Sequence, residues 1–167
     1  MAKAYYSTVF AQSADDIWSV IRDFNNYPVW VDGAGASEIE CGKSGDAAGA
    51  VRNVLYQGRR IRQRLLALSD IERSQVYEFC GDAPMPVERY RATLRVTPII
   101  DGERGLVEWW ATFDCAPERH DEWTAFFRSA FAGWLSSLRR LLDGRGGSGG
   151  RTASERTTVT PTPAATA

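Results

Sequence analysis

Alternating apolar and polar residues run through the middle of the chain and predict a meander of antiparallel strands. Period-two alternation rich in β-branched and aromatic residues is typical of half-buried strands. The predicted strands are Lys3–Phe10, a segment near Ser37–Glu40, Val51–Gln57, Arg59–Asp70, Gln75–Cys80, Val87–Pro98 and Gly105–Asp114. The dipeptide Gln57-Gly58 separates two of them and favours a hairpin turn.

Each of the later strands has one apolar and one charged face, because successive side chains of a strand point to opposite sides of a sheet. The apolar face is predicted to carry Ile61, Gln63, Leu65, Ala67, Tyr90, Ala92, Leu94, Val96, Val107, Trp109, Ala111 and Phe113. The opposite face carries Arg60, Arg62, Arg64, Arg89, Arg91, Arg95 and Glu108. The pattern therefore predicts a sheet with one buried and one solvated face.

Helical periodicity appears at both ends of this strand-rich region. Ser13 is a typical N-cap, and apolar residues at helical spacing follow it up to Phe24. A short turn or second helix follows and carries Tyr27 and Trp30. A longer helix begins at Pro117 and is predicted to end at Gly144, a good C-cap residue. Its broad apolar stripe predicts that it packs on the buried face of the sheet.

The last part of the chain, residues 144–167, is rich in Gly, Ser, Thr, Pro and Ala. Such a segment cannot bury enough apolar surface to offset the entropy lost on ordering. We therefore expect a flexible tail there and a single α+β domain over residues 1–143.

Charge and composition narrow the function. The 167 residues include 20 Lys and Arg and 21 Asp and Glu, a net charge of −1, so the basic field of a nucleic-acid binder is not expected. No apolar run approaches the roughly 20 residues that cross a bilayer, so no membrane insertion is predicted. Three cysteines without CxxC spacing indicate reduced thiols and a cytoplasmic protein. A metal site that needs two or three imidazoles is not expected, since there is one histidine, and no cofactor is predicted.

Five segments of the chain stand out together: SADDIWSVIRDFNNYPVW, GAVRNVLYQG, RLLALSDIERSQVYEF, ERYRATLRVTP and VEWWATFD. Their succession resembles the START-like or SRPBCC superfamily, which includes polyketide cyclase/dehydrase-like proteins, birch-pollen-allergen-like proteins and plant abscisic-acid receptors. The resemblance implies a helix-grip fold, a curved seven-stranded antiparallel sheet wrapped around a long C-terminal helix, with two short helices after the first strand. It also implies a cavity that in relatives holds lipids, sterols, hormones or polyketide-like molecules.

Positions that line the pocket of the plant abscisic-acid receptors can be carried over to this chain as part of the resemblance. They fall on Gln63, Tyr77, Phe79, Tyr90, Ala92, Phe126, Ala130 and Trp134. The gate loop of the receptors is replaced by the short segment Tyr56–Arg59, and their latch by Met85–Val87. A pocket is therefore expected without the hormone-sensing switch.

The residues themselves point to the same region. Gln63 is the one polar residue in an apolar inward run, so either a neighbouring tyrosine or a ligand must satisfy its amide. Tyr56, Tyr77 and Tyr90 combine apolar rings with polar tips, which suits a hydrophobic ligand that bears oxygen, although core packing explains them equally well. Trp109 is expected in the core or in a cavity wall.

Candidate acid–base groups are few. Glu108 would enter the cavity only if a bulge shifted its strand by one residue; otherwise it pairs with an arginine of a neighbouring strand on the outer face. His120 is expected at the surface near the start of the last helix. The weak catalytic candidates are Tyr90, Gln63 and Glu108.

Three hypotheses follow. The preferred one is a carrier or sensor that binds a hydrophobic or amphipathic small molecule between the sheet and the last helix. The first alternative is a polyketide cyclase or dehydratase that uses the same cavity. The second alternative is an interaction module whose cavity is filled by side chains. The pattern leaves the ligand and the oligomeric state open.

Overall fold

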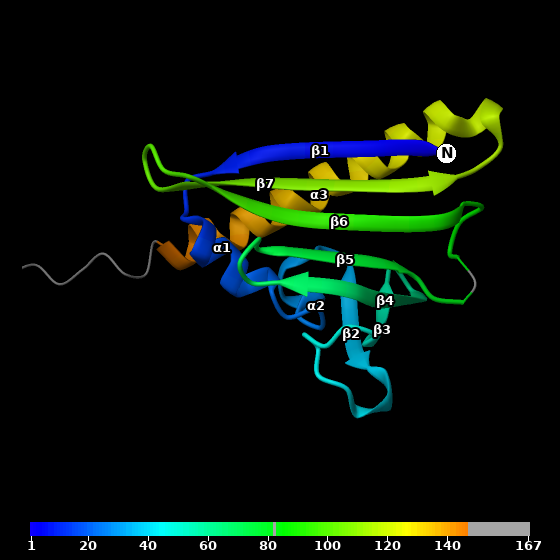
Figure 1. Ribbon diagram of the computed structural model, residues 1–167, viewed down its shortest axis with the longest axis horizontal. Coiled ribbons are helices and arrows are strands. Elements are labelled where there is room, and N and C mark those ends of the chain that lie inside the picture. The colour runs from blue at the N-terminus through cyan, green and yellow to red at the C-terminus, as the bar shows by residue number, and fades with distance from the viewer. Residues whose placement is uncertain (82, 147–167) are drawn as a thin grey trace, which may run out of the picture.

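The computed structural model describes residues 1–81 and 83–146, and these form one antiparallel sheet with a long helix across its inner face (Figure 1). The seven strands lie in the order β1-β7-β6-β5-β4-β3-β2. The strands are β1 Ala2–Phe10, β2 Ala34–Ile39, β3 Val51–Tyr56, β4 Arg59–Ser69, β5 Ser74–Phe79, β6 Glu88–Ile99 and β7 Arg104–Asp114. The helices are α1 Ala14–Ile21, α2 Tyr27–Trp30 and α3 His120–Gly146, with short 3₁₀ turns at Glu40–Gly42 and Pro117–Arg119.

This arrangement is the helix-grip fold expected from the sequence. Strands β2 to β7 follow one another as antiparallel neighbours, and β1 closes the order by pairing with β7. The β3–β4 hairpin turns at Gln57 and Gly58, whose φ angles of 47° and 78° are the left-handed values of a two-residue hairpin loop. Tyr56 pairs with Arg59 directly across this turn, which sets the register of the whole hairpin.

The core lies between the sheet and α3. Every second residue of β7 is buried, and the buried set is Gly105, Val107, Trp109, Ala111 and Phe113. The stripe of α3 that faces the sheet consists of Trp123, Phe127, Phe131, Leu135, Leu138 and Leu142. Their steps of three and four residues place them on one side of the helix, so the predicted amphipathic packing is confirmed.

A β-bulge in β4 corrects one detail of the predicted faces. The pairing with β5 shifts between Leu65 and Ala67, where the strand holds an extra residue. An extra residue reverses which side the following side chains occupy. Ala67 is therefore exposed and Leu68 turns inward, although simple alternation predicts Ala67 on the buried face.

The first helices cover one end of the sheet (Figure 1). The Ser13 hydroxyl accepts a hydrogen bond from the Asp16 backbone N–H at 3.1 Å, which confirms the predicted N-cap of α1. The hydrogen-bonded turn after α1 is followed by α2, whose Tyr27 and Trp30 are buried in the core. Pro28 lies in the first turn of this short helix, where a backbone N–H would have no partner within the helix, so its absence costs no hydrogen bond.

The long helix α3 continues to Gly146, so Gly144 does not end it as predicted. Good helix formers such as Leu141 and Leu142, packed on the core, carry the helix past one glycine at a modest cost. The remainder of the predicted tail, from residue 147, lies outside the described residues.

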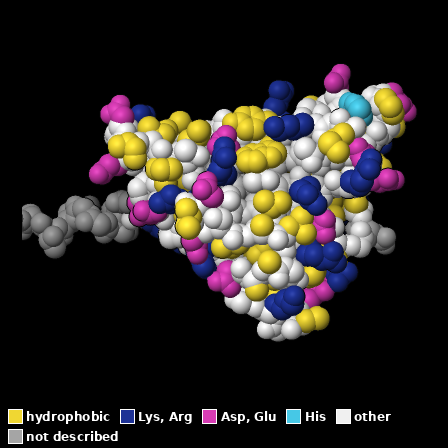
Figure 2. All heavy atoms as spheres, viewed as in Figure 1, with side chains coloured by type: hydrophobic (Ala, Val, Ile, Leu, Met, Phe, Trp, Pro, Cys, Tyr) yellow, Lys and Arg dark blue, Asp and Glu magenta, His cyan; other side chains and the backbone are white. Residues whose placement is uncertain are grey.

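The outer face of the sheet carries charges of both signs (Figure 2). Arg64 on β4 pairs with Glu78 on β5 at 3.1 Å, and Arg95 on β6 pairs with Glu108 on β7 at 2.7 Å. Part of the arginine face is thus matched by cross-strand ion pairs, as expected from the near-zero net charge. Within residues 1–81 and 83–146, no helix has the length and apolarity needed to cross a bilayer.

Asp70 links α1 to the end of β4. Its carboxylate accepts hydrogen bonds from Arg22 Nε at 2.7 Å and from Trp18 Nε1 at 2.8 Å. The Arg22 guanidinium and then the Trp18 indole lower the pKa of Asp70 from 3.8 to about 2. Since the folded state holds this proton less tightly than the unfolded state, Asp70 stabilises the fold above about pH 4.

We expect that stabilisation to be lost as the pH falls from about 4 to about 2. Replacing Asp70 by Asn should therefore flatten the pH dependence of the urea unfolding midpoint in this window. Asp101→Asn, in the exposed turn before β7, serves as the control and should follow the wild type. Parallel curves for wild type and Asp70→Asn would contradict the assigned role of Asp70.

Candidate ligand-binding cavity

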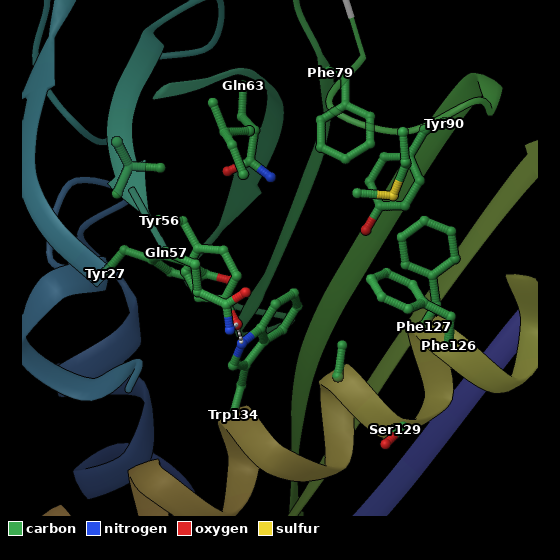
Figure 3. Close-up of a pocket in the computed structure, with 14 residues that line it drawn as sticks. Tyr27, Tyr56, Gln57, Gln63, Phe79, Tyr90, Phe126, Phe127, Ser129 and Trp134 are labelled. Atoms are coloured by element: carbon green, nitrogen blue, oxygen red, sulfur yellow. Dashed lines mark hydrogen bonds between the residues drawn. The ribbon is translucent and has the colours of Figure 1, made fainter. Parts of the chain in front are cut away.

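A cavity of about 440 Å³ lies between the sheet and α3 (Figure 3). Strands β3 to β6 supply one wall, α3 supplies the other, and α2 contributes Tyr27. The lining residues are Tyr27, Val54, Tyr56, Gln57, Ile61, Gln63, Phe79, Met85, Tyr90, Phe126, Phe127, Ser129, Ala130 and Trp134. A volume of this size falls in the range that holds a small organic molecule.

The cavity has a buried floor and an exposed rim. The floor is formed by the buried residues Tyr27, Val54, Gln63, Tyr90 and Phe127. The rim includes the exposed residues Gln57, Phe126 and Ser129. Phe126 leaves 48% of its surface open although it is a large aromatic residue, which places an apolar ring at the entrance.

Tyr56 and Trp134 are hydrogen-bonded to each other across the cavity wall. Trp134 Nε1 on α3 donates to the Tyr56 hydroxyl on β3 at 2.9 Å, and the ring centroids lie 5.7 Å apart (Figure 3). Gln57 Nε2 donates to the same oxygen at 3.3 Å. Because the Tyr56 oxygen accepts both bonds, its own proton is available for a ligand.

The amide of Gln63 is satisfied on one side only. Its Oε1 accepts a hydrogen bond from Nη2 of Arg52, the residue directly opposite on β3. Its Nε2 faces the cavity (Figure 3) and makes no side-chain hydrogen bond within the described part of the chain. The sequence pattern left a neighbouring tyrosine or a ligand as the partner of Gln63, and it did not single out Arg52.

A signal for Arg52 was present in the hairpin. Counting back from the Gln57-Gly58 turn pairs position 52 with position 63, and Arg52 shares a strand face with Val54. A charged residue on the apolar face of a strand is unusual, because charged side chains are rarely buried unless they have a partner. Tyr27 gave no such signal, because α2 is too short for a periodic pattern.

The floor tyrosines are neutral hydrogen-bonding groups. Burial raises the pKa of Tyr90 well above its usual 10, and the neighbouring Tyr77 and Tyr27 hydroxyls act in the same direction. Burial likewise raises the pKa of Tyr27. Phe79 stacks on the Tyr90 ring with centroids 4.2 Å apart, which holds the Tyr90 hydroxyl toward the cavity (Figure 3).

The structure brings most of the predicted ligand-binding residues to this cavity. Those that line it are Tyr56, Gln63, Phe79, Tyr90, Phe126, Ala130 and Trp134. Lining residues that were not among the predicted ligand-binding residues are Tyr27, Val54, Gln57, Ile61, Met85, Phe127 and Ser129. Ile61 and Phe127 follow the same alternation and helical spacing as the predicted members, so that pattern could have identified them.

Three predicted ligand-binding residues lie in the core instead. Tyr77, Ala92 and Trp109 face inward, but none of them lines the cavity. Trp109 stacks on Phe131 of α3 with centroids 4.9 Å apart, and its Nε1 donates to the Tyr77 hydroxyl at 3.0 Å. Facing inward is therefore not enough to reach the cavity, because Phe131 of α3 covers Trp109 and the Phe24 ring packs against Tyr77.

Glu108, a weak catalytic candidate, lies on the outer face. Its Oε2 accepts from Arg95 Nη2 at 2.7 Å, and its Oε1 accepts from the Tyr5 hydroxyl at 3.1 Å. Partial burial acts to raise the pKa of Glu108, but the hydrogen bonds from Arg95 and Tyr5 outweigh it and lower the pKa. No bulge turns Glu108 inward, because Trp109 keeps the inward position next to it.

The cavity wall carries no charged side chain among the described residues. His120 begins α3 and does not contribute to the lining. Within the same residues, no group of three or more His, Cys, Asp or Glu side chains is arranged to hold a metal ion. The polar groups of the site are hydroxyls and amides, which orient a ligand by hydrogen bonding.

A seven-stranded sheet that wraps a C-terminal helix and leaves a cavity between them defines the helix-grip class of proteins. The family model described as "Polyketide cyclase / dehydrase and lipid transport" matches residues 1–143. The chain therefore belongs to this family, within the superfamily that the sequence resembles. Comparison with curated proteins finds no match.

Solved structures show the same fold. A protein from Thermobifida fusca is 31% identical with a TM-score of 0.76, covering 87% of this chain and 95% of that one. The protein XoxI from Bacillus cereus is 27% identical with a TM-score of 0.76, covering 87% and 99%. A truncated norcoclaurine synthase from Thalictrum flavum is 16% identical with a TM-score of 0.67, covering 84% and 92%, and shows the fold alone.

Proposed function

We propose that the protein binds a hydrophobic or amphipathic small molecule in the cavity between the sheet and α3, as a carrier or sensor. The observation that carries this proposal is the cavity of about 440 Å³ with an aromatic lining and a few hydrogen-bonding groups at its floor. The family description, which names lipid transport beside polyketide cyclases, supports the same class of ligand.

The energetics of such a site favour binding. Burying about 300 Å² of apolar ligand surface contributes on the order of 7 kcal/mol before the costs of association. Floor hydroxyls and the Gln63 amide then select an orientation rather than supply most of the affinity. We expect apolar aromatic molecules of two or three rings to bind in the micromolar range.

An enzyme of the cyclase or dehydratase kind is the alternative within this family. Such chemistry needs a group that takes up a proton in addition to groups that polarise a carbonyl. Gln63 and Tyr90 suit the second role, but no carboxylate or imidazole lines the cavity among the described residues. Binding without chemistry is therefore the function that the lining supports best.

A titration with the neutral fluorophore N-phenyl-1-naphthylamine tests the proposal. We expect a saturable rise in fluorescence with one binding site per chain. Native mass spectrometry of the same sample should show a single added mass. Linear, non-saturating fluorescence and an unliganded mass would refute a ligand-binding function for this cavity.

A further inference from the structure

Arg52 is a buried cation next to the cavity floor. Only 2% of its surface is exposed, and its guanidinium lies between the rings of Phe24 and Tyr27, at 4.0 Å from each centroid. Nη1 donates to the Phe24 backbone oxygen at 2.6 Å, and Nη2 donates to Gln63 Oε1. Nε is buried and has no hydrogen-bond partner.

The charge of Arg52 has no carboxylate paired with it in the part of the chain that the structure describes. A small internal void of about 10 Å³ adjoins Arg52, and the acidic residue that lines this void is Asp23. Asp23 Oδ1 accepts a hydrogen bond from the Asn25 backbone N–H at 2.8 Å. Its negative charge favours the charged form of Arg52, but no ion pair joins the two side chains among the described residues. Aromatic faces solvate the guanidinium in part, but they supply no negative charge.

Arg52 also determines how Gln63 is oriented. A guanidinium has only donors, so the atom of Gln63 that faces it must be the amide oxygen. The amide NH₂ group is consequently the end that faces the cavity. A hydrogen bond from a cation to the oxygen polarises the amide and makes this NH₂ group a stronger donor.

The positive charge of Arg52 thus lies directly behind the floor, the polarised NH₂ group of Gln63 lies at the floor, and no carboxylate is among the described lining residues. Charge interactions are strong there because the surroundings are poorly solvated. Tyr90 adds a neutral hydroxyl that points into the same space (Figure 3). The floor is therefore suited to a ligand group that carries negative charge and accepts hydrogen bonds.

Resting on the proposed function, we propose that the cavity selects amphipathic molecules that carry an anionic oxygen, such as an aromatic or aliphatic acid. The anionic oxygen accepts a hydrogen bond from Gln63 Nε2, and Arg52 acts as its buried counter-charge one side chain away. The apolar part of the ligand lies against the aromatic lining toward α3. Arg52 is a positioning residue here, since it acts through Gln63.

A matched pair of fluorophores tests this charge preference in the wild-type protein. 8-Anilinonaphthalene-1-sulfonate is N-phenyl-1-naphthylamine with an added sulfonate. We expect the anionic probe to bind at least tenfold more tightly, with the preference maintained at about 0.5 M salt, where surface charges are screened. Equal affinities or a preference for the neutral probe overturn the inference alone, whereas binding of neither probe overturns the proposed function as well.

The sharpest variant is Gln63→Glu. A glutamate has nearly the same shape and can accept the same bond from Arg52, so the protein is expected to fold. The new carboxylate neutralises Arg52 and presents oxygen instead of NH₂ to the ligand. We expect the ratio of the two dissociation constants to shift by at least tenfold toward the neutral probe, and an unchanged ratio would overturn the proposal.

Two further variants complete the experiment. Arg60→Gln changes the net charge by the same amount on the outer face of the same strand, and should leave both affinities at the wild-type value. Arg52→Met removes the charge itself and should also shift the ratio toward the neutral probe. Since Arg52→Met leaves the Phe24 oxygen without its donor and can unfold the protein, Gln63→Glu is the deciding variant.

Discussion

Replacing Ala130 by tryptophan should abolish binding of N-phenyl-1-naphthylamine, with an affinity loss of at least 100-fold. Ala130 lies on α3, lines the cavity and is half-buried, so a large side chain at this position enters the space that a ligand would occupy. The helix itself needs no rearrangement, because Ala130 lies between the packed residues Phe127 and Phe131 without belonging to that stripe. The melting temperature should be unchanged or slightly higher, since the indole buries apolar surface.

Ala125→Trp provides the matched control for this substitution. Ala125 is exposed on the same helix and is not part of the cavity lining. The Ala125→Trp variant should therefore retain wild-type affinity in the same fluorescence titration. Full binding by Ala130→Trp, together with a wild-type melting temperature, would show that the probe binds elsewhere on the protein.

Replacing Trp109 by alanine should lower the free energy of unfolding by about 3–5 kcal/mol. Trp109 is fully buried, stacks on Phe131 and lies 5.1 Å from the Trp134 ring, so its removal leaves a large void between β7 and α3. The Tyr77 hydroxyl also loses the donor that Trp109 Nε1 supplies. Many domains have only about 5–15 kcal/mol of stability, so this variant should be close to unfolding at physiological temperature.

Trp110→Ala is the control, because Trp110 is the next residue on the same strand but lies on the outer face. Its ring contacts Lys3 and Arg95 at 5.9 Å and 5.5 Å from the centroid. Such half-exposed cation–π contacts contribute about 1 kcal/mol or less each. Urea unfolding of both variants measures the difference, and equal losses would contradict the assignment of the two faces of β7.

Much of the fold was predictable because it depends on short-range patterns. The Ser13 cap, the Gln57-Gly58 turn and the stripe of α3 each follow from residues close together in the chain. The side of the sheet on which Ala67 lies was not predictable in this way. It depends on a bulge in the pairing of β4 with β5, which alternation within one strand does not reveal.

The candidate site was predictable only in part. Alternation and helical spacing predicted that Gln63, Tyr90 and Ala130 face the interior, and all three line the cavity. They did not distinguish these residues from Trp109, because a covered position and an open position have the same periodicity. The difference arises from the aromatic side chains of α3, which fill the space over Trp109 and leave space over Gln63.

The sequence by itself determined the order of helices and strands, the apolar face of most strands and that a long helix must cover the sheet, since each follows from local periodicity and capping. Tertiary structure alone decided where the interior stays open and that the Arg52 guanidinium lies between two aromatic rings. The physical reason is that volume and charge in an interior are set by side chains from several distant segments at once.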